Sequence, residues 1–246
     1  MAIHSDLTLL DGKLPHGEVH VWHCDLERLQ GAEKPLLELL DAAERERAGR
    51  FKFAAPYHQF VVSRGLLRIA MGQYLAIPAH DVVFETTAQG KPEVPGRPLF
   101  FNLSHTEGAA AIAITGAGRV GIDVERVRNN VKPLELAERF FSAPEAEWLK
   151  GQAVEQQLGS FFACWTAKEA YIKAHGGGLA MGLSGFGVIP RGDAGELRLQ
   201  VYGRPAEAEP WSMWQLHLEP DLRSALAVEG KNLTVRIGKI TEVPQG

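Results

Sequence analysis

Residues 120–125, Val-Gly-Ile-Asp-Val-Glu, hold two carboxylates at a spacing that suits metal-assisted chemistry. The stretch alternates strictly, so as a strand it would turn its β-branched residues to one face and Gly121, Asp123 and Glu125 to the other. Neighbouring carboxylates repel one another, and a divalent cation bound by their oxygens would relieve that repulsion. Gly121 carries no side chain, so it offers room for close approach of a ligand.

Residues 161–173 predict a helix with a second group of charged side chains. At about 100° per residue its apolar residues form one stripe, and Glu169 and Lys173 lie one turn apart at the border of that stripe. Lys168 projects within the stripe, where its ammonium must reach solvent or meet an anion. The glycines at 176–178 are expected to end the helix. Taken alone, the pattern also fits an amphipathic helix with an ordinary surface Glu/Lys pair.

The elements that must position these residues follow from periodicity and from turn and cap residues. Helices are predicted at 35–40, 56–75, 133–140 and 142–148, with a further short helix opened by a capping box at 41–44 and another capping box at 142–145. Strands are predicted at 18–24, 82–86, 99–103, 109–115, 186–189, 197–202, 214–218, 225–229 and 233–237. Both parts of the chain run from a long helix into a strand series, which indicates α+β architecture. Residue identities between the two parts are too sparse to establish a repeat.

Five ordered motifs together resemble the signature of the Sfp-type 4'-phosphopantetheinyl transferases. They are Gly-Lys-Pro at 90–92, Phe-Asn-Leu-Ser-His at 101–105, Gly-Ile-Asp-Val-Glu at 121–125, Phe-Phe-Ser at 140–142 and Trp-Thr-Ala-Lys-Glu-Ala-Tyr-Ile-Lys at 165–173. The resemblance implies a pseudo-dimer of two similar halves, with helices packed on mainly antiparallel sheets and coenzyme A in the cleft between the halves. The glycine-rich turn at 115–119 places the boundary between an N-terminal half, 1–117, with coenzyme A contacts, and a C-terminal half, 118–246, with the metal site and the catalytic helix.

The resemblance also implies a reaction: the 4'-phosphopantetheine arm of coenzyme A moves to a serine of an apo acyl or peptidyl carrier protein, and adenosine 3',5'-bisphosphate is released. Asp123, Glu125 and Glu169 would hold Mg²⁺ or Mn²⁺. Lys173 would neutralise the transferring phosphate, and Glu169 would accept the serine proton, directly or through a metal-bound water. The expected contacts of coenzyme A are Arg45, Arg47, Arg64, Lys91, Ser104, His105, Asp123, Lys168 and Lys173.

Blander interpretations stand beside these roles. From composition alone, the arginines of 45–50 form a solvated face, because Glu44 and Glu46 interleave with them, and Glu44 stands where some members of the family have Lys. Lys91 would be part of an exposed turn, and His105 a structural hydrogen-bonding residue. Two other functions remain open: a nonenzymatic coenzyme A or nucleotide sensor, and an Mg²⁺-dependent phosphohydrolase.

Composition limits the class of protein. The 246 residues, 45% of them hydrophobic, suffice for a sizeable core, and 30 Asp and Glu against 26 Lys and Arg leave a net charge of −4, which does not favour nucleic acid or an acidic membrane as a partner. The two cysteines, Cys24 and Cys164, are expected to be buried free thiols. No apolar run is long enough to span a bilayer and no targeting segment is evident, so a cytoplasmic monomer is expected. Apolar residues of 131–141 and 176–181 are the expected docking surface for the carrier.

Overall fold

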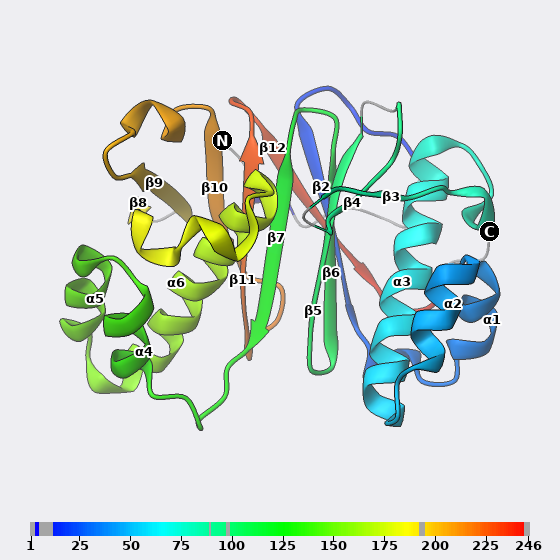
Figure 1. Ribbon diagram of the computed structural model, residues 1–246, viewed down its shortest axis with the longest axis horizontal. Helices are drawn as coiled ribbons and strands as arrows, with labels where there is room; N and C mark the ends of the chain where they lie inside the picture. Colours follow the sequence, from blue (N-terminus) through cyan, green and yellow to red (C-terminus); the bar gives the residue numbers. More distant parts are fainter. Residues whose placement is uncertain (1–2, 5–11, 89, 97–98, 192–194, 244–246) are drawn as a thin grey trace.

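A computed structural model of the protein describes residues 3–4, 12–88, 90–96, 99–191 and 195–243. Two five-stranded sheets lie next to each other in the centre, and helices cover their outer faces, as Figure 1 shows. The α+β class predicted from the sequence is confirmed. Among the described residues, no helix is long and apolar enough to cross a membrane.

The first sheet carries the helices of the N-terminal half. Its strands are, in order, β1 (Ile3–His4), β12 (Thr234–Ile240), β2 (Glu18–Asp25), β6 (Ala109–Thr115) and β5 (Phe100–Thr106). The helices are α1 (Glu33–Leu39), α2 (Ala42–Gly49) and α3 (Ala54–Leu75), and β3 (Glu85–Thr86) pairs with β4 (Pro92–Glu93) in a small hairpin. Trp22 and Cys24 of β2 pack in the core beneath α3, while Val19 and Val21 turn to the other sheet.

The second sheet carries the helices of the C-terminal half. Its strands are, in order, β7 (Val120–Arg126), β11 (Leu222–Glu229), β10 (Trp211–Leu216), β9 (Glu196–Val201) and β8 (Phe186–Arg191). The helices are α4 (Pro133–Phe140), α5 (Ala143–Lys150) and α6 (Val154–His175). Short 3₁₀ helices are η1 (Glu27–Leu29), η2 (Ala79–Asp81), η3 (Gly178–Met181), η4 (Leu183–Gly185) and η5 (Pro205–Ala208). The order of layers is therefore helix, sheet, sheet, helix.

Most predicted elements are found, and the differences have physical reasons. The strand at 109–115 and the helix at 133–140 have the predicted bounds. Helix α6 begins seven residues before the predicted stretch. Residues 154–160 were missed because they are mostly polar and show no apolar stripe. The strand predicted at 82–86 is reduced to β3, since the carbonyl of Val82 accepts a hydrogen bond from Arg68 Nη1 (2.7 Å).

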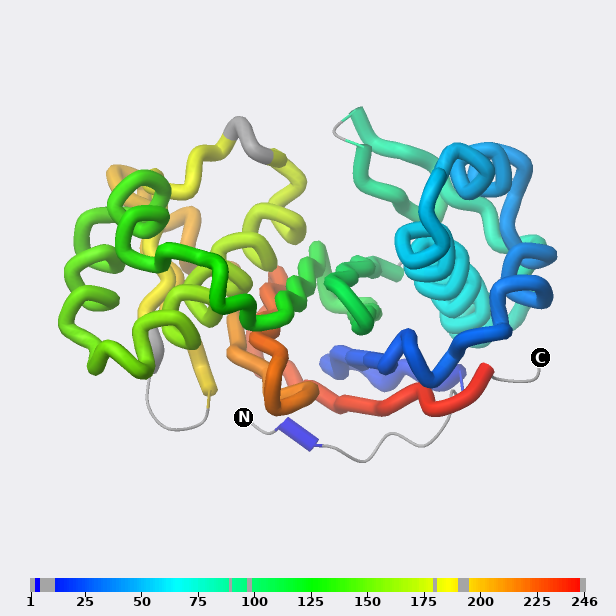
Figure 2. The backbone as a smooth tube through the Cα atoms, turned by 90° about the horizontal axis from the view of Figure 1, so that it is seen from below, coloured from blue at the N-terminus to red at the C-terminus, as the bar shows by residue number. Residues whose placement is uncertain are grey.

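The last strand, β12, returns to the first sheet and runs parallel to β2 and β1, an exception to the antiparallel pairing elsewhere. Figure 2 shows this end of the chain passing beneath the N-terminal half. The core between the sheets includes Val21 from one side, Val124 from the other and Val235 of β12. Division of the chain at 117/118 stays a prediction, but in space the second half contributes a strand to the first.

A row of side-chain hydrogen bonds joins the two sheets where β5 and β7 meet. Polar side chains at alternate positions of β5 accept hydrogen bonds from backbone N–H groups at alternate positions of β7. The pairs, acceptor first, are Asn102–Ile122 (2.9 Å), Ser104–Val124 (3.3 Å) and Thr106–Arg126 (3.3 Å). Because an edge strand presents unpaired N–H groups, these side chains take the place of a missing backbone ladder. We call this row the β5–β7 seam.

Candidate active site

Helix α6 and strand β7 bring Lys173 and Asp123 into direct contact. Lys173 Nζ lies 2.6 Å from Asp123 Oδ1 and donates a second hydrogen bond to Ser104 Oγ (2.9 Å). Ser104 in turn donates its hydroxyl proton to the same Asp123 oxygen (3.0 Å). The predicted faces of β7 are confirmed, because Val120, Ile122 and Val124 lie in the core between the sheets. Residues separated by fifty positions in sequence thus meet at one point.

Gly121 is needed for this contact, but not for the reason predicted from the sequence. A Cβ at Gly121 would lie 2.1 Å from the carbonyl oxygen of Ala170 and 2.4 Å from the backbone nitrogen of Ala174. The close neighbour is therefore the backbone of α6, not a ligand. The absence of a side chain lets α6 lie directly on β7, which carries Glu169 and Lys173 to the acidic face of the strand.

The three predicted metal-binding carboxylates influence one another. Burial and the charge of Asp123 raise the pKa of Glu125, and the same two causes raise the pKa of Glu169, although Lys173 opposes the shift in both. Asp123 itself is only 5% exposed. Its Oδ2 is buried without a hydrogen-bond partner in the described residues. Crowded carboxylates with an unpaired oxygen are the surroundings that a hard cation would stabilise.

The side chains do not form a closed ligand set as they stand. Among the described residues, no group of three or more His, Cys, Asp or Glu side chains is close enough to hold a metal ion. Instead, the Lys173 ammonium supplies the positive charge at Asp123. The chemistry of the donors fits Mg²⁺, and the magnesium site stays a prediction.

A cleft of about 310 Å³ opens between the halves beside this cluster. Lys91, Asn102, Glu169 and Lys173 are among its lining residues, so both halves contribute walls. Lys91 Nζ donates to the carbonyl oxygens of Lys173 (2.9 Å) and Val120 (3.0 Å), which ties the hairpin of the first half to the second. Burial lowers the pKa of Lys91 to about 8. A lysine held in this way keeps its charge at neutral pH, and a bound anion nearby would stabilise that charged form.

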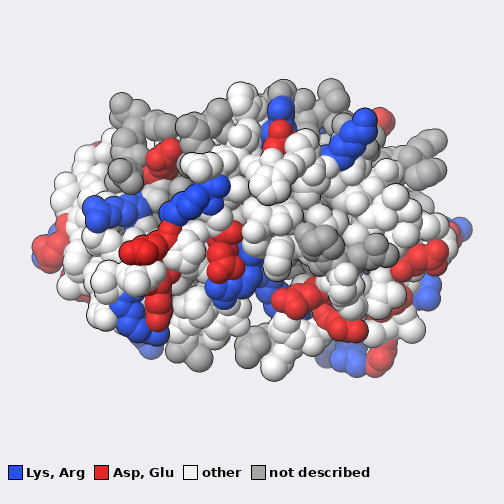
Figure 3. All heavy atoms as spheres, turned by 90° about the horizontal axis from the view of Figure 1, so that it is seen from above, with Lys and Arg blue, Asp and Glu red and all other residues white. Residues whose placement is uncertain are grey.

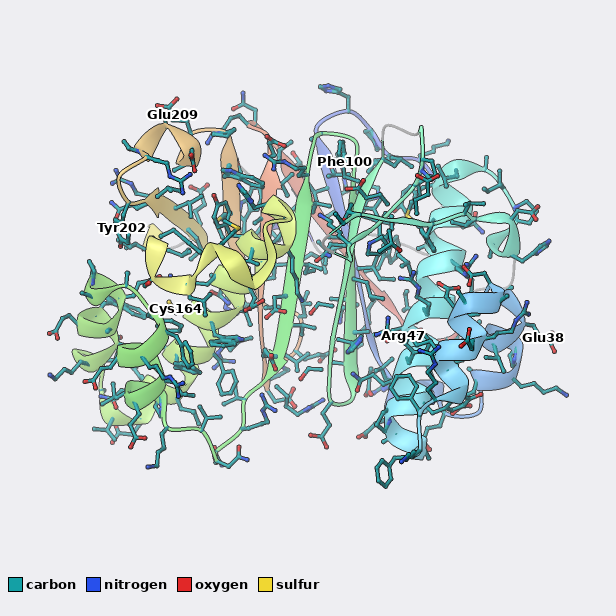
Figure 4. All side chains as sticks on the ribbon, viewed as in Figure 1. Glu38, Arg47, Phe100, Cys164, Tyr202 and Glu209 are labelled. Atoms are coloured by element: carbon teal, nitrogen blue, oxygen red, sulfur yellow. The ribbon has the colours of Figure 1, made fainter. Side chains whose placement is uncertain are left out.

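A second cavity, of about 550 Å³, lies in the first half between α2, α3 and β5. Arg47, Arg64 and His105 line it, whereas the predicted contact Arg45 does not. Arg47, labelled in Figure 4, lies on the side of α2 that faces the central strands. The Ser63 hydroxyl on its wall is buried and has no hydrogen-bond partner in the part of the chain that the structure describes. Asp41 and Glu44 also line the cavity, so its charges are mixed, and Arg47 and Arg64 are the cations that could bind a phosphorylated ligand.

His105 sits where this cavity approaches the cleft. The side-chain amide of Gln59 lies 2.5 Å from His105 Nδ1, and an amide N–H there requires Nδ1 to accept. With this assignment the ring proton belongs to Nε2. Although the His105 side chain is exposed, desolvation by neighbouring protein atoms lowers its pKa, and the charges of Lys173 and Arg47 act in the same direction. The neutral ring can still serve as a hydrogen-bond donor.

Lys168 requires a correction. The sequence predicted a contact with coenzyme A, but the Lys168 side chain has no exposed surface. Its Nζ donates to Glu145 Oε2 (2.6 Å) and to the carbonyl oxygen of Phe186 (2.6 Å). The alternative that the ammonium meets an anion is therefore right, and the anion belongs to the protein.

Two residues of the site, Gln59 and Thr106, were not found from the sequence, and neither was Glu145 as the partner of the buried Lys168. Glu145 was recognised as the end of a capping box, and its bond to the backbone N–H of Ser142 (3.0 Å) confirms that box. No signal indicated its second role as the partner of Lys168. Thr106 directly follows the Phe-Asn-Leu-Ser-His motif with the alternation of Asn102 and Ser104, which could have indicated a shared face.

Both predicted free thiols are buried, and burial raises the pKa of Cys24 to about 12.

Comparisons with known proteins find relatives of this chain. Two family models match: "4'-phosphopantetheinyl transferase, N-terminal" over residues 26–116 and "4'-phosphopantetheinyl transferase superfamily" over residues 119–228. The chain is 37% identical over 179 residues to the 4'-phosphopantetheinyl transferase HetI of Nostoc sp., which covers 71% of this chain and 73% of that protein. It is 36% identical over 174 residues to psf-1 of Bacillus pumilus, with 69% and 72% covered. It is 28% identical over 200 residues to Sfp of Bacillus subtilis, with 80% and 85% covered.

Proposed function

The chain belongs to the 4'-phosphopantetheinyl transferase family and transfers the phosphopantetheine arm of coenzyme A to carrier proteins, and we propose that the cluster around Asp123 and Lys173 is the centre of that reaction. The resemblance found in the sequence motifs is thereby confirmed. The observation that carries the proposal is that Glu169 and Lys173 line the cleft between the halves, while Lys173 also contacts the buried Asp123, whose Oδ2 has no hydrogen-bond partner among the described residues.

Coenzyme A is bound across both halves in this proposal. The cavity lined by Arg47, Arg64 and His105 receives the nucleotide phosphates, supported by its cations and by the unsatisfied Ser63 hydroxyl. Arg64 also forms an ion pair with Glu44, so part of its charge is already neutralised. Lys91 then stands between this cavity and the cleft, where it contacts the pyrophosphate.

Asp123, Glu125 and Glu169 would hold Mg²⁺ or Mn²⁺, which when bound supplies positive charge to the pyrophosphate oxygens. Lys173, released from Asp123, is a clamp for the charge that develops on the transferring phosphate. The oxygen of the acceptor serine forms a new bond to the β-phosphorus of coenzyme A. The bond from this phosphorus to the bridging oxygen breaks, and that oxygen leaves with the electron pair as part of adenosine 3',5'-bisphosphate. Glu169 accepts the serine proton.

The raised pKa of Glu169 supports its role as the proton acceptor. An ordinary glutamate is a weak base at neutral pH, whereas burial and the charge of Asp123 make Glu169 more basic. Lys173 opposes that shift, so Asp123 and Lys173 act on the basicity of Glu169 in opposite directions. Because one chain supplies both walls of the cleft, a monomer is sufficient for the reaction.

The test is intact-mass analysis of an apo carrier protein incubated with coenzyme A, Mg²⁺ and this protein. We expect the carrier to gain one phosphopantetheine group and adenosine 3',5'-bisphosphate to appear in equal amount. Coenzyme A binding without any product would favour the sensor alternative. Release of adenosine 3',5'-bisphosphate without a carrier would favour the phosphohydrolase.

A further inference from the structure

The β5–β7 seam does more than close an edge, because its hydroxyls also reach the acidic side chains of β7. Ser104 Oγ donates to Asp123 Oδ1 (3.0 Å), and Thr106 Oγ1 donates to Glu125 Oε2 (3.3 Å). Each hydroxyl meanwhile accepts a hydrogen bond from a β7 backbone N–H group. A hydroxyl group has a single proton to donate. Because each oxygen accepts a hydrogen bond from β7 on one side, its proton points to the other side, where the carboxylate lies.

We propose that Thr106 is a positioning residue for the cation site, and that it fixes Glu125 in the orientation needed to share a metal ion with Asp123. The inference rests on the proposed function, in which these two carboxylates are metal ligands. Ligating carboxylates are commonly oriented by a second hydrogen-bonded layer, and loss of one such partner typically weakens metal binding about 10- to 100-fold. The hydroxyls lie in the first half and the carboxylates in the second, so affinity for the cation depends on contact between the halves.

Competition for Glu125 explains why this hydroxyl matters. Arg128 Nη2 lies 3.6 Å from the same Glu125 Oε2, and its side chain is half exposed. An arginine on the solvent side draws the carboxylate outward, while the buried Thr106 hydroxyl holds it against β5. Without that hydroxyl, Arg128 is the remaining partner of this oxygen among the described residues, and Glu125 turns away from Asp123.

Thr106 allows a sharper test than Ser104. Ser104 also contacts Lys173 and is an expected coenzyme A contact, so its loss would change several functions together. Thr115 offers a matched control, because its buried hydroxyl likewise works on both sides, donating to the carbonyl oxygen of Glu18 (2.9 Å) and accepting from Ala117 N–H (3.1 Å). It lies at the far end of β6 from the site, since Thr106 pairs with Ala109 at the near end.

The experiment measures Mn²⁺ binding to the full chain by electron paramagnetic resonance of free Mn²⁺, with coenzyme A present. We expect Thr106→Val and Thr106→Ala to bind Mn²⁺ about 10- to 100-fold more weakly than the parent. Thr106→Ser, which keeps the hydroxyl and loses only the methyl group, should bind within about threefold of the parent, and Thr115→Val should be unchanged. The Ser and Ala variants both lack the methyl group, so their difference isolates the hydroxyl even if Thr106→Val folds poorly.

A kinetic readout accompanies the binding data. The Mg²⁺ concentration for half-maximal transfer should rise by the same factor in Thr106→Ala, while the rate at saturating Mg²⁺ stays within a few-fold of the parent. Equal Mn²⁺ affinity of Thr106→Ala and the parent would overturn the inference, as would equal weakening by Thr106→Ser or Thr115→Val. If the parent transfers phosphopantetheine but binds no Mn²⁺, the metal assignment in the proposed function fails, and this inference fails with it.

Discussion

The two long helices, α3 and α6, are built alike although their sequences differ. Each has 22 residues, and their first residues are numbered 54 and 154. Each carries one fully buried cation, Arg68 in α3 and Lys168 in α6. Each cation is bonded to the glutamate that closes the capping box of a preceding short helix: Arg68 Nε to Glu44 (2.5 Å), and Lys168 Nζ to Glu145 (2.6 Å).

The likeness extends to the segment that follows each helix. Arg68 donates to the carbonyl oxygen of Val82 and Lys168 to that of Phe186, so one cation in each half joins a capping box, a long helix and the next segment. These contacts use no residue of the proposed reaction. They give both halves the same scaffold, and they explain why a lysine, Lys168, lies inside the apolar stripe of α6.

The halves differ at the positions next to the buried cation. In α6, Glu169 and Lys173 line the cleft. The positions one hundred residues earlier hold Ile69 and Gln73, which line a mainly apolar cavity of about 660 Å³. The residues proposed for the chemistry therefore lie on one copy of the scaffold and are not part of the buried cation contacts that both copies share. In the other copy, the corresponding face is packed or lined with apolar residues.

Replacement of Glu169, whose counterpart in α3 is Ile69, should have the largest effect. Glu169→Gln keeps the shape of the side chain and removes its proton affinity, so turnover should fall about 10²- to 10⁴-fold, as for loss of a general base. Folding should be unaffected or slightly improved, because repulsion from Asp123 is relieved. A polar residue of α3 provides the control: Gln73→Ala, at the position that corresponds to Lys173, should retain the parental turnover within about twofold. A purified Glu169→Gln protein that modifies its carrier at the parental rate would remove the distinction between the helices.

The buried cations should differ in how strongly folding depends on them. Lys168→Met leaves Glu145 with neutral donors only, and breaking a buried pair in this way typically costs about 3–5 kcal/mol of unfolding free energy. Arg68→Met should cost less, because Glu44 keeps the guanidinium of Arg64. Denaturant unfolding measures both, and Glu145→Met combined with Lys168→Met should regain part of the loss. Equal losses for the two single variants would show that Arg64 does not compensate.

Lys91 gives a smaller, pH-dependent effect at the boundary of the halves. Its pKa of about 8 lies below the ordinary value of 10.5, so the ammonium loses its proton in the free protein as pH rises through 8. Phosphate binding needs the charged form, and KM for coenzyme A should therefore rise above pH 8. Lys91→Met should raise KM about tenfold at pH 7 and abolish that inflection, consistent with loss of a charged hydrogen bond. The exposed Lys132→Met is the control, and a variant that retains the inflection would assign it to another group.

The same shift predicts how stability depends on pH. Burial disfavours the charged form of Lys91, so its cost to folding is present below pH 8 and disappears as pH rises from 8 towards the unfolded value of 10.5. Glu125 and Glu169 have the opposite sign. Their raised pKa values favour protonation in the folded state, so the stability they contribute is present below about pH 4.5 and is lost as pH rises through their folded values.

Local features could be predicted from the sequence, whereas contacts across the fold could not. The capping boxes of α2 and α5, the alternation of β7 and the glycine end of α6 depend on neighbours within a few residues, and each was found. The partner of Lys168 lies 23 residues away on another helix, and the helix backbone against Gly121 comes from packing. The seam escaped prediction because its hydrogen bonds join side chains to backbone, and so obey no strand-pairing pattern.

Salt should affect the binding of coenzyme A and of the carrier differently. This is the smallest of the expected effects. Coenzyme A is expected to meet the cations Arg47, Arg64 and Lys91, and their attraction is screened within about 10 Å at 0.1 M salt. The carrier is expected to dock on apolar residues of 131–141 and 176–181, and the side chains of Val131, just before α4, and of Leu134 in α4 are only partly buried. On the face seen in Figure 3, acidic and basic side chains are intermixed, and the net charge is −4, so no strong field attracts an acidic carrier. From low to moderate salt, KM for coenzyme A should rise several-fold while KM for each of several apo carriers changes less than about twofold. A steep salt dependence for the carrier, or strict use of one carrier, would place its recognition on charge and remove the contrast between the halves.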